Sequence, residues 1–301
     1  DSHYYHKTVT SFPIPSVIIR SLSKTYSNGV KALIDINLEM HSGIYGLLGK
    51  NGAGKSTLMR TLATLQPADS GEARLDNIDL LTEQRKARKF IGYLPQEMGV
   101  HPHMSAFEAL EYYAGLKGLR RSIDIREELD KVNLTKVADQ RLDTFSGGMR
   151  RRFGIAAAFL GNPRLVIVDE PTAGLDPFER RRFQQLLLTT AQNCVLVLSS
   201  HIVDDIQNLA NRMAILHNGQ VVAEGAPEEL VNTLQGKVWS CSVSLRELEE
   251  WQSKTNVLSC RPQSGNHLLR VWSDSSPGEA FSPATPDLED FYAYRIDGDQ
   301  S

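Results

Sequence analysis

The sequence predicts an α/β fold in which a mixed sheet has buried parallel strands at its centre. Continuous apolar runs of strand length recur at Ile44 to Leu48, Leu165 to Val168 and Cys194 to Leu198. Such runs are typical of strands covered on both faces, and stretches with helical spacing separate them, as in α/β proteins. Chemically capable side chains follow these runs, and the carboxyl ends of strands are where doubly wound sheets bind ligands.

Composition restricts the possible classes of protein. The 301 residues are 41% hydrophobic and 23% charged, which is ordinary for a globular protein of one to three domains. A formal net charge of -3 provides no electrostatic case for nucleic-acid binding. The three cysteines stand far apart and predict neither a metal site nor a disulfide framework. No apolar run approaches the roughly 20 residues that span a bilayer, so a membrane-spanning part is expected on another chain.

Residues 1–15 read as a leader or a remnant of an expression tag, because the chain opens on Asp1 and carries histidines and tyrosines before Pro13. A metal site formed by His3 and His6 is the alternative, and a loose terminus is the favoured interpretation. The stretch lacks the apolar region of a signal peptide.

The first regular element is expected to be an antiparallel hairpin. Val17 to Tyr26 reads as a strand, and Asn28-Gly29 reads as its turn. From Ile34 to Met40 apolar and polar residues alternate, which predicts a half-buried antiparallel strand. Tyr26 lies where the hairpin bends and could stack on a base, although for this tyrosine taken alone packing is the better interpretation.

The stretch from Gly49 to Thr57 fits the phosphate-binding pattern G-x-x-x-x-G-K-[ST]. A strand-like run precedes it and apolar residues at helical spacing follow it, which is the context that the motif requires. Its glycines let backbone N–H groups turn toward an anion, and the helix adds its positive dipole end. A glycine-rich turn with a lysine by chance is the alternative. The residues expected to bind a nucleotide here are Gly49, Asn51, Gly52, Ala53, Gly54, Lys55, Ser56 and Thr57.

The middle of the chain predicts an inserted helical subdomain at about residues 97–160. Before it, strands near Ala73 to Leu75 and Ile91 to Leu94 flank a polar helix, and Gln96 follows the second strand. Met104 to Leu116 and Ile125 to Leu134 then show helical spacing without strand signals.

A serine and two glycines, Ser146-Gly147-Gly148, open a further helix. Backbone N–H groups at a helix N-terminus bind anions, so this is a second candidate anion-binding turn. An ordinary helix cap made by Ser146 is the alternative.

Several chemically capable groups are expected at one edge of the sheet. Asp169 and Glu170 follow a buried strand and, after a phosphate loop, suggest a magnesium ligand with a second acidic group, whereas a single acid there could be a helix cap. His201 follows the next buried strand, although a lone histidine at a strand end is usually structural. Asp176 lies in a turn before another helix.

The C-terminal part predicts a small appendage of strands and helices. A hairpin around Asn218-Gly219, the favoured type I′ pair, and a short helix after Ala226 lead to a boundary at Gly236. Beyond it the pattern indicates a β-α-β unit and a final helix, with Trp239 and Trp272 in its core. Its elements are expected at Val238 to Val243, Leu245 to Trp251, Leu268 to Trp272 and Asp287 to Tyr294.

Taken together, residues 17 to 235 resemble the nucleotide-binding subunit of an ATP-binding-cassette (ABC) transporter. The motifs follow the family's order and spacing, and other phosphate-loop families lack the Ser-Gly-Gly turn. The matching motifs are Walker A at Gly49 to Thr57, the Q-loop at Gln96, the signature at Phe145 to Met149, Walker B at Leu165 to Glu170, the D-loop at Leu175-Asp176 and the switch histidine at His201. The resemblance implies a P-loop NTPase of the ABC type at 16–236, with an antiparallel β subdomain and the helical subdomain, and an accessory region at 237–301.

Two positions depart from the family's usual pattern. Lys50 stands where proline is frequent, and Phe145 stands where leucine usually precedes the signature serine. Neither position supplies a phosphate ligand, so the resemblance still implies a competent ATPase.

The resemblance further implies two identical cassettes that close head to tail around two ATP molecules. Each copy would lend Ser146, Gly147 and Gly148 to the γ-phosphate of its partner's nucleotide. Asp176 is also expected to bind nucleotide, and Tyr26 falls where the family stacks the adenine.

The resemblance also implies roles in catalysis, which in phosphoryl transfer consists of positioning and charge stabilisation. Glu170 would polarise the attacking water and His201 would contact the γ-phosphate, with Lys55 and Gln96 completing the set. The Mg²⁺ ligands would be Ser56, Gln96 and, through water, Asp169.

Residues 101–110, the arginine-rich end of the signature and the final helix resemble bacterial exporter cassettes. This implies ATP-driven export with an integral-membrane subunit on a separate chain, and a peripheral place on the cytoplasmic face of the cell membrane. Nucleic acid is not an expected partner. Two alternatives stay open: a soluble ABC ATPase acting on ribosomes or DNA, which the single cassette disfavours, and a nucleotide sensor with little turnover.

Overall fold

The computed structural model describes residues 14–96, 99, 103–119, 122–172, 175–263 and 265–297. The expected leader, with His3 and His6, lies outside them apart from its last two residues, and so do Gly174 and part of the segment at 101–110. Across the described ranges, no helix combines the length and the apolar character that crossing a membrane requires.

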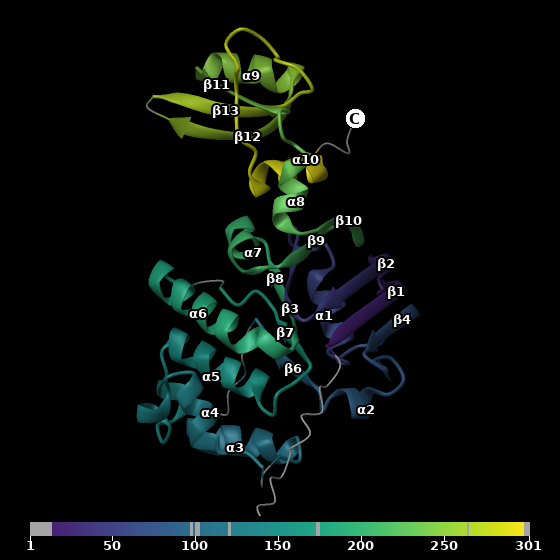
Figure 1. Ribbon diagram of the computed structural model, residues 1–301, viewed down its shortest axis with the longest axis vertical. Coiled ribbons are helices and arrows are strands. Elements are labelled where there is room, and N and C mark those ends of the chain that lie inside the picture. Colours follow the sequence, from purple (N-terminus) through teal and green to yellow (C-terminus); the bar gives the residue numbers. More distant parts are fainter. Residues whose placement is uncertain are drawn as a thin grey trace, which may run out of the picture.

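The centre of the molecule is a six-stranded mixed sheet, with strand order β10-β9-β3-β8-β7-β6 (Figure 1). All neighbouring pairs are parallel except β9 and β10, which form the predicted hairpin. Both turn residues, Asn218 and Gly219, have positive φ, as a type I′ turn requires. The strands are β3 (Gly43–Leu48), β6 (Ile91–Leu94), β7 (Leu165–Val168), β8 (Val195–Ser200), β9 (Arg212–His217) and β10 (Gln220–Gly225).

The parallel register places the predicted motifs at one edge of this sheet. Leu48, the last residue of β3, pairs with Ser200, the last residue of β8. Val168, the last residue of β7, pairs with Leu198 on the other side of β8. The loop after β3, the acids after β7 and the histidine after β8 therefore start side by side.

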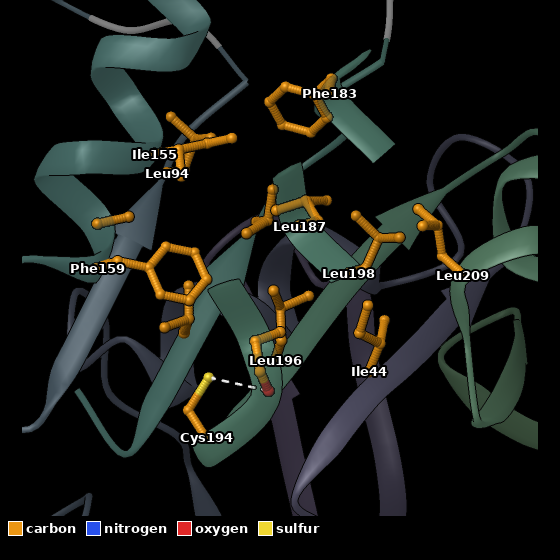
Figure 2. Close-up of a cluster of buried hydrophobic side chains, with 14 of the residues drawn as sticks. Ile44, Leu94, Ile155, Phe159, Phe183, Leu187, Cys194, Leu196, Leu198 and Leu209 are labelled. Carbon is orange, nitrogen blue, oxygen red and sulfur yellow. Dashed lines mark hydrogen bonds between the residues drawn. The ribbon is translucent and has the colours of Figure 1, made fainter. Parts of the chain in front are cut away.

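The side chains of the central strands divide between two hydrophobic cores. Val195 and Val197 of β8 belong to the core shared with the antiparallel sheet, whereas Leu196 and Leu198 belong to the core shared with the helices. Figure 2 shows part of the second core, in which Leu196 lies near Leu187 of a covering helix. The buried runs therefore lack the alternation of polar and apolar residues because both faces of the sheet are covered.

The antiparallel sheet has the order β2-β1-β4-β5 and shares its core with the first helix, α1 (Lys55–Leu62). It lies on the opposite side of the central sheet from the helices α3 to α6 (Figure 1). The predicted hairpin is its β1–β2 pair. Its strands are β1 (Ser16–Thr25), β2 (Lys31–His41), β4 (Ser70–Leu75) and β5 (Ile78–Asp79), and the polar helix before β6 is α2 (Gln84–Ala87).

The other face of the central sheet is covered by helices. Their shared core includes Phe153, Phe159 and Phe183, together with the inward residues of the strands. Between residues 103 and 160 the described residues form helices and turns, with one isolated bridge from Ser105 to Arg141. The helices are α3 (Ala106–Leu116), α4 (Ile125–Lys131), α5 (Gly147–Phe159), α6 (Pro177–Thr190) and α7 (Val203–Leu209), with short 3₁₀ turns between α4 and α5 and after α6.

The C-terminal appendage has one strand more than the predicted β-α-β unit and a short edge pairing besides. Its antiparallel sheet has the order β12-β13-β11-β14 and carries the helix α9 (Leu245–Lys254). The missed strand, β12, contains Pro262 and few apolar residues; it forms an edge, where proline is tolerated. The strands are β11 (Val238–Val243), β12 (Asn256–Gln263), β13 (Asn266–Trp272) and β14 (Ser282–Pro283).

The last helix, α10 (Leu288–Asp297), connects the appendage to the cassette (Figure 1). It packs against β12 and also against α7 and α8 (Pro227–Asn232). Asp290, which is buried, accepts two hydrogen bonds from the guanidinium of Arg270 on β13. Trp272 stacks on Tyr294 of α10, with ring centroids 5.3 Å apart. The ion pair and the stacked rings thus fix α10 to its own sheet, and the contacts of α10 with α7 and α8 hold the appendage to the rest of the chain.

Candidate functional site

The loop between β3 and α1 is closed by its own lysine. Lys55 Nζ donates hydrogen bonds to the carbonyl oxygens of Gly49, at 2.7 Å, and Lys50, at 3.3 Å. Burial lowers the pKa of the Lys55 ammonium, and the carboxylates of Glu170 and Asp169 oppose that shift. The partners of this buried ammonium are backbone carbonyls and nearby carboxylates. Such an ammonium is suited to bind a phosphate group.

Gly54 shows why the loop needs glycine. Its φ is +107°, a left-handed conformation that side chains rarely adopt. A Cβ atom there would also lie 2.5 Å from the carbonyl oxygen of Ala32 in β2. The antiparallel sheet therefore packs directly on the turn that starts α1.

Asp169, the first acid after β7, is only 4% exposed and is held by hydroxyl groups. Ser199 Oγ on β8 donates to its Oδ1 at 2.7 Å, and Ser56 Oγ lies 3.5 Å from the same oxygen. Ser199 also accepts a hydrogen bond from the backbone N–H of Glu170, at 2.9 Å. Sequence patterns did not point to Ser199, whose one signal is a hydroxyl at the end of an apolar buried strand.

The carboxylate of Glu170 lies beside each of the other three predicted catalytic side chains. Its Oε1 lies 3.7 Å from Lys55 Nζ and 3.3 Å from His201 Nδ1. Its Oε2 accepts a long hydrogen bond, 3.5 Å, from Gln96 Nε2. The φ of Glu170 is +43°, a left-handed backbone conformation that is unusual outside glycine and concentrates at functional sites. The structure therefore brings Glu170, His201, Gln96 and Lys55 together.

An open pocket of about 400 Å³ lies over the loop. Tyr26 stands at its wall, where its hydroxyl lies 3.0 Å from Thr57 Oγ1. Gly49 and Ala53 do not line the pocket but pack against the protein beneath the loop. A Cβ at Gly49 would lie 2.5 Å from the carbonyl oxygen of Leu216, and Ala53 is buried. The lining residues are Tyr26, Val30, Ala32, Asn51, Gly52, Gly54, Lys55, Ser56, Thr57, Gln96 and Glu170.

The signature turn does not line this pocket within one copy of the chain. Ser146 caps α5 by accepting a hydrogen bond from Met149 N–H, at 3.2 Å. Gly147 lines a separate, smaller pocket, and a Cβ at Gly148 would lie 2.4 Å from Glu179 Oε2 of α6. Asp176 likewise caps its own helix, α6. In one copy Ser146 and Asp176 are therefore helix caps, Gly148 packs against Glu179, and none of the four residues lines the pocket over the loop.

The residues proposed for Mg²⁺ provide a suitable set of donors. Ser56 Oγ and Asp169 Oδ1 are 3.5 Å apart beside the loop, and the amide of Gln96 is on the same pocket wall. Mg²⁺ favours oxygen ligands and commonly uses one or two carboxylates together with substrate phosphates and water. Among the described residues no three His, Cys, Asp or Glu side chains form a metal cluster.

The fold and the site together define a phosphate-loop nucleotide-binding protein. It has a covered parallel sheet, a glycine loop before a helix, and a buried acid at the end of β7, two strands away from the strand that precedes the loop. Comparison with known proteins narrows this class. The family model described as "ABC transporter" matches residues 33–173.

Curated relatives lie in the same family. The linearmycin resistance ATP-binding protein LnrL of Bacillus subtilis is 34% identical over 222 residues, which cover 72% of this chain and 71% of that protein. The daunorubicin/doxorubicin resistance ATP-binding protein DrrA of Streptomyces peucetius is 37% identical over 232 residues, covering 75% and 70%. ABC transporter A family member 8 of Dictyostelium discoideum is 37% identical over 242 residues; the match covers 77% of this chain but spans 29% of that protein's length.

Solved structures agree with this assignment. An ATP-binding subunit of an ABC transporter is 25% identical, with a TM-score of 0.64 over 72% of this chain and 92% of the other. A dimeric ATP-binding cassette in a post-hydrolysis state with ADP and Pi is 26% identical, with a TM-score of 0.62 over 70% and 98%. The chain belongs to the ABC transporter family, as one of its ATPase cassettes.

Proposed function

We propose that this chain binds and hydrolyses ATP as the energy-supplying subunit of a membrane exporter. The observation that carries the proposal is the position of Glu170, whose carboxylate contacts Lys55, His201 and Gln96 at the wall of the loop pocket. A carboxylate placed beside the phosphate site, with a histidine and an amide around it, can orient a water for attack on the terminal phosphate.

Each group has a distinct task in this proposal. Lys55 leaves the carbonyls of Gly49 and Lys50 and binds the β- and γ-phosphates, while the loop N–H groups bind the phosphate oxygens. Glu170 accepts a hydrogen bond from the attacking water. His201, whose side chain is 45% exposed, contacts the γ-phosphate. Tyr26 stacks on the adenine at the pocket wall.

Ser56, Gln96 and, through water, Asp169 would hold Mg²⁺, which would neutralise phosphate charge. Asp169 suits this role because Ser199 Oγ donates a hydrogen bond to its carboxylate and so orients it. The protein's own part is to keep these oxygens in place before the nucleotide arrives.

Two copies of the chain would complete each site. The signature residues Ser146, Gly147 and Gly148 lie outside the pocket of their own copy, so a partner's turn is needed to cover the γ-phosphate. Asp176 would meet the partner at the same interface. A related cassette of known structure is dimeric with ADP and Pi, which supports this arrangement.

The exporter assignment rests on the relatives' names. Two bacterial relatives that match over most of their length are named for resistance to linearmycin and to daunorubicin and doxorubicin. Outward transport by a separate integral-membrane subunit would account for such resistance. This chain would then be peripheral, at the cytoplasmic face of the cell membrane, and would not bind nucleic acid.

The substitution Glu170→Gln tests the proposal. It keeps the shape of the side chain and removes the charge that polarises water, so turnover should fall on the order of a hundredfold or more. ATP binding should persist, and light scattering should detect a stable dimer with ATP. The matched control is Glu72→Gln, an exposed position on β4. Wild-type hydrolysis by Glu170→Gln would remove Glu170 from the mechanism.

A further inference from the structure

Besides Asp169, a second buried carboxylate lies near the site, on the helix that follows His201. Asp205 on α7 is 1% exposed and accepts hydrogen bonds with both oxygens. Its Oδ2 accepts from the hydroxyls of Thr172, at 2.5 Å, and Ser200, at 3.2 Å. Its Oδ1 accepts from Arg180 Nε, at 2.7 Å, and Gln184 Nε2, at 3.0 Å. A buried charge is stable only when it is paired and hydrogen-bonded in this way.

The two oxygens of Asp205 bind different parts of the site. Thr172 is two residues after Glu170, and Ser200 is the residue before His201. Arg180 and Gln184 lie on α6, the helix that Asp176 caps. One carboxylate therefore joins the segment of the proposed base, the segment of the phosphate-contacting histidine and the helix that starts at the proposed dimer interface.

The side chain of His201 makes few contacts that could fix its position. Its side chain is half-exposed, and Glu170 is the contact made by its Nδ1. The backbone beside it is fixed by Ser200, whose Oγ donates to Asp205 and accepts the N–H of Ile202, at 2.9 Å. The position of the imidazole thus depends on the Ser200–Asp205 contact.

We propose that Asp205 is a positioning residue that couples α6 to the Glu170–His201 pair. Asp205 holds the side chains of Glu170 and His201 in the arrangement that ATP hydrolysis requires. Because Asp205 also binds α6, this arrangement depends on the position of α6. The catalytic part of this inference rests on the proposed function, whereas the mechanical part does not.

The mechanical part is tested by hydrogen–deuterium exchange on the full chain without nucleotide. In Asp205→Asn one acceptor oxygen becomes an NH₂ group, so one pair of donors loses its partner. Exchange at residues 169–172, 177–184 and 199–204 should rise together, by about tenfold, while residues 49–57 stay within about twofold of wild type. Faster exchange confined to α7 would overturn the coupling, whether or not the wild type hydrolyses ATP.

The catalytic part is tested by separating turnover from binding. A displacement near 1 Å costs about a hundredfold in rate, so Asp205→Asn should lower kcat to that extent and leave the Kd for ATP within about twofold. Thr172→Val should lower kcat as well, Thr172→Ser should preserve it, and Thr172→Val combined with Asp205→Asn should be less than additive.

The matched control is Asp290→Asn, which alters an equally buried, ion-paired aspartate in the appendage. It should lower the melting temperature and keep kcat. If Asp205→Asn behaved in the same way, Asp205 would be structural and the proposal would be wrong. A wild-type chain without ATPase activity would instead contradict the proposed function, and the exchange measurement would still decide the coupling.

Discussion

At the scale of single residues, Tyr26 shows how a side chain can be held ready for a ligand. The tyrosine is 37% exposed and lines the pocket over the loop. Its hydroxyl is fixed beside Thr57 Oγ1, and its backbone N–H donates to the carbonyl oxygen of Val30. The ring is therefore anchored at its tip and at its backbone, on the wall of the pocket.

We expect Tyr26→Ala to weaken ATP binding by roughly tenfold, because stacking between a base and an aromatic ring contributes about 1–3 kcal/mol. Turnover at saturating ATP should change by less than about twofold. Equilibrium binding of a fluorescent ATP analogue measures the effect. Tyr26→Phe is the matched control, since it keeps the ring and loses the contact with Thr57. Unchanged affinity in Tyr26→Ala would show that the tyrosine only packs.

Site residues could be predicted from the sequence only where they belong to local motifs. Lys55, Glu170 and His201 each follow a strand in a recognisable pattern, and the structure brings them together as expected. Ser199 and Asp205 could not be found in this way. A serine in a buried strand and an aspartate in a short helix acquire their roles only through neighbouring strands and helices, which the sequence does not specify directly.

At the scale of elements, helix starts follow simple local chemistry. Ser105 and Glu108 form a reciprocal capping box at α3. At the start of α9, Glu247 accepts hydrogen bonds from the backbone N–H and the hydroxyl of Ser244. The chemistry of such caps is local, because both partners lie within one turn. The edge strand β12 could not be predicted from the sequence, because its own residues are largely polar and include Pro262, although it pairs with the next strand, β13, across a short turn.

The α3 cap should make stability depend on pH. Hydrogen bonds from the backbone and hydroxyl of Ser105 hold the pKa of Glu108 below its ordinary value of 4.5. The folded carboxyl thus binds its proton less tightly than the unfolded one, so its stabilisation is complete above about pH 4.5 and is lost as pH falls through the lower folded value.

Urea unfolding of the wild type and of Glu108→Gln between pH 6 and pH 3.5 measures this effect. The difference in free energy of unfolding should be largest at pH 6 and should shrink as the pH falls. Glu111→Gln, on the same helix, is the control. A difference that grew on acidification would contradict the assigned cap.

At the scale of the whole molecule, the appendage and the cassette share a core. Leu288, Phe291 and Ile296 of α10 belong to the same buried cluster as the helices that cover the central sheet. Arg295 of the same helix also donates a hydrogen bond to the carbonyl oxygen of Val222 in β10. The sequence pattern changes at Gly236, as predicted, but the parts of the chain before and after Gly236 pack against each other.

Removal of residues 237–301 should consequently destabilise the remaining cassette. Three buried apolar side chains of α10 are lost, each contributing about 1.5–3 kcal/mol, so the melting temperature should fall on the order of 10 °C. Differential scanning fluorimetry measures the change. Phe291→Ala in the full chain is the matched control and should reproduce part of it. An unchanged melting temperature would mean that the cassette does not depend on α10.

The parallel register of the central sheet also limits how the length of this chain can vary. Adding or deleting one residue within β8 would shift everything after it by about 3.3 Å and would turn each following side chain toward the opposite core. Leu198 would exchange places with a valine, Ser199 would point away from Asp169, and His201 would leave its neighbours. Insertions and deletions should therefore accumulate in the turns and in the appendage, while the spacing inside these strands stays as constant as the reactive residues themselves.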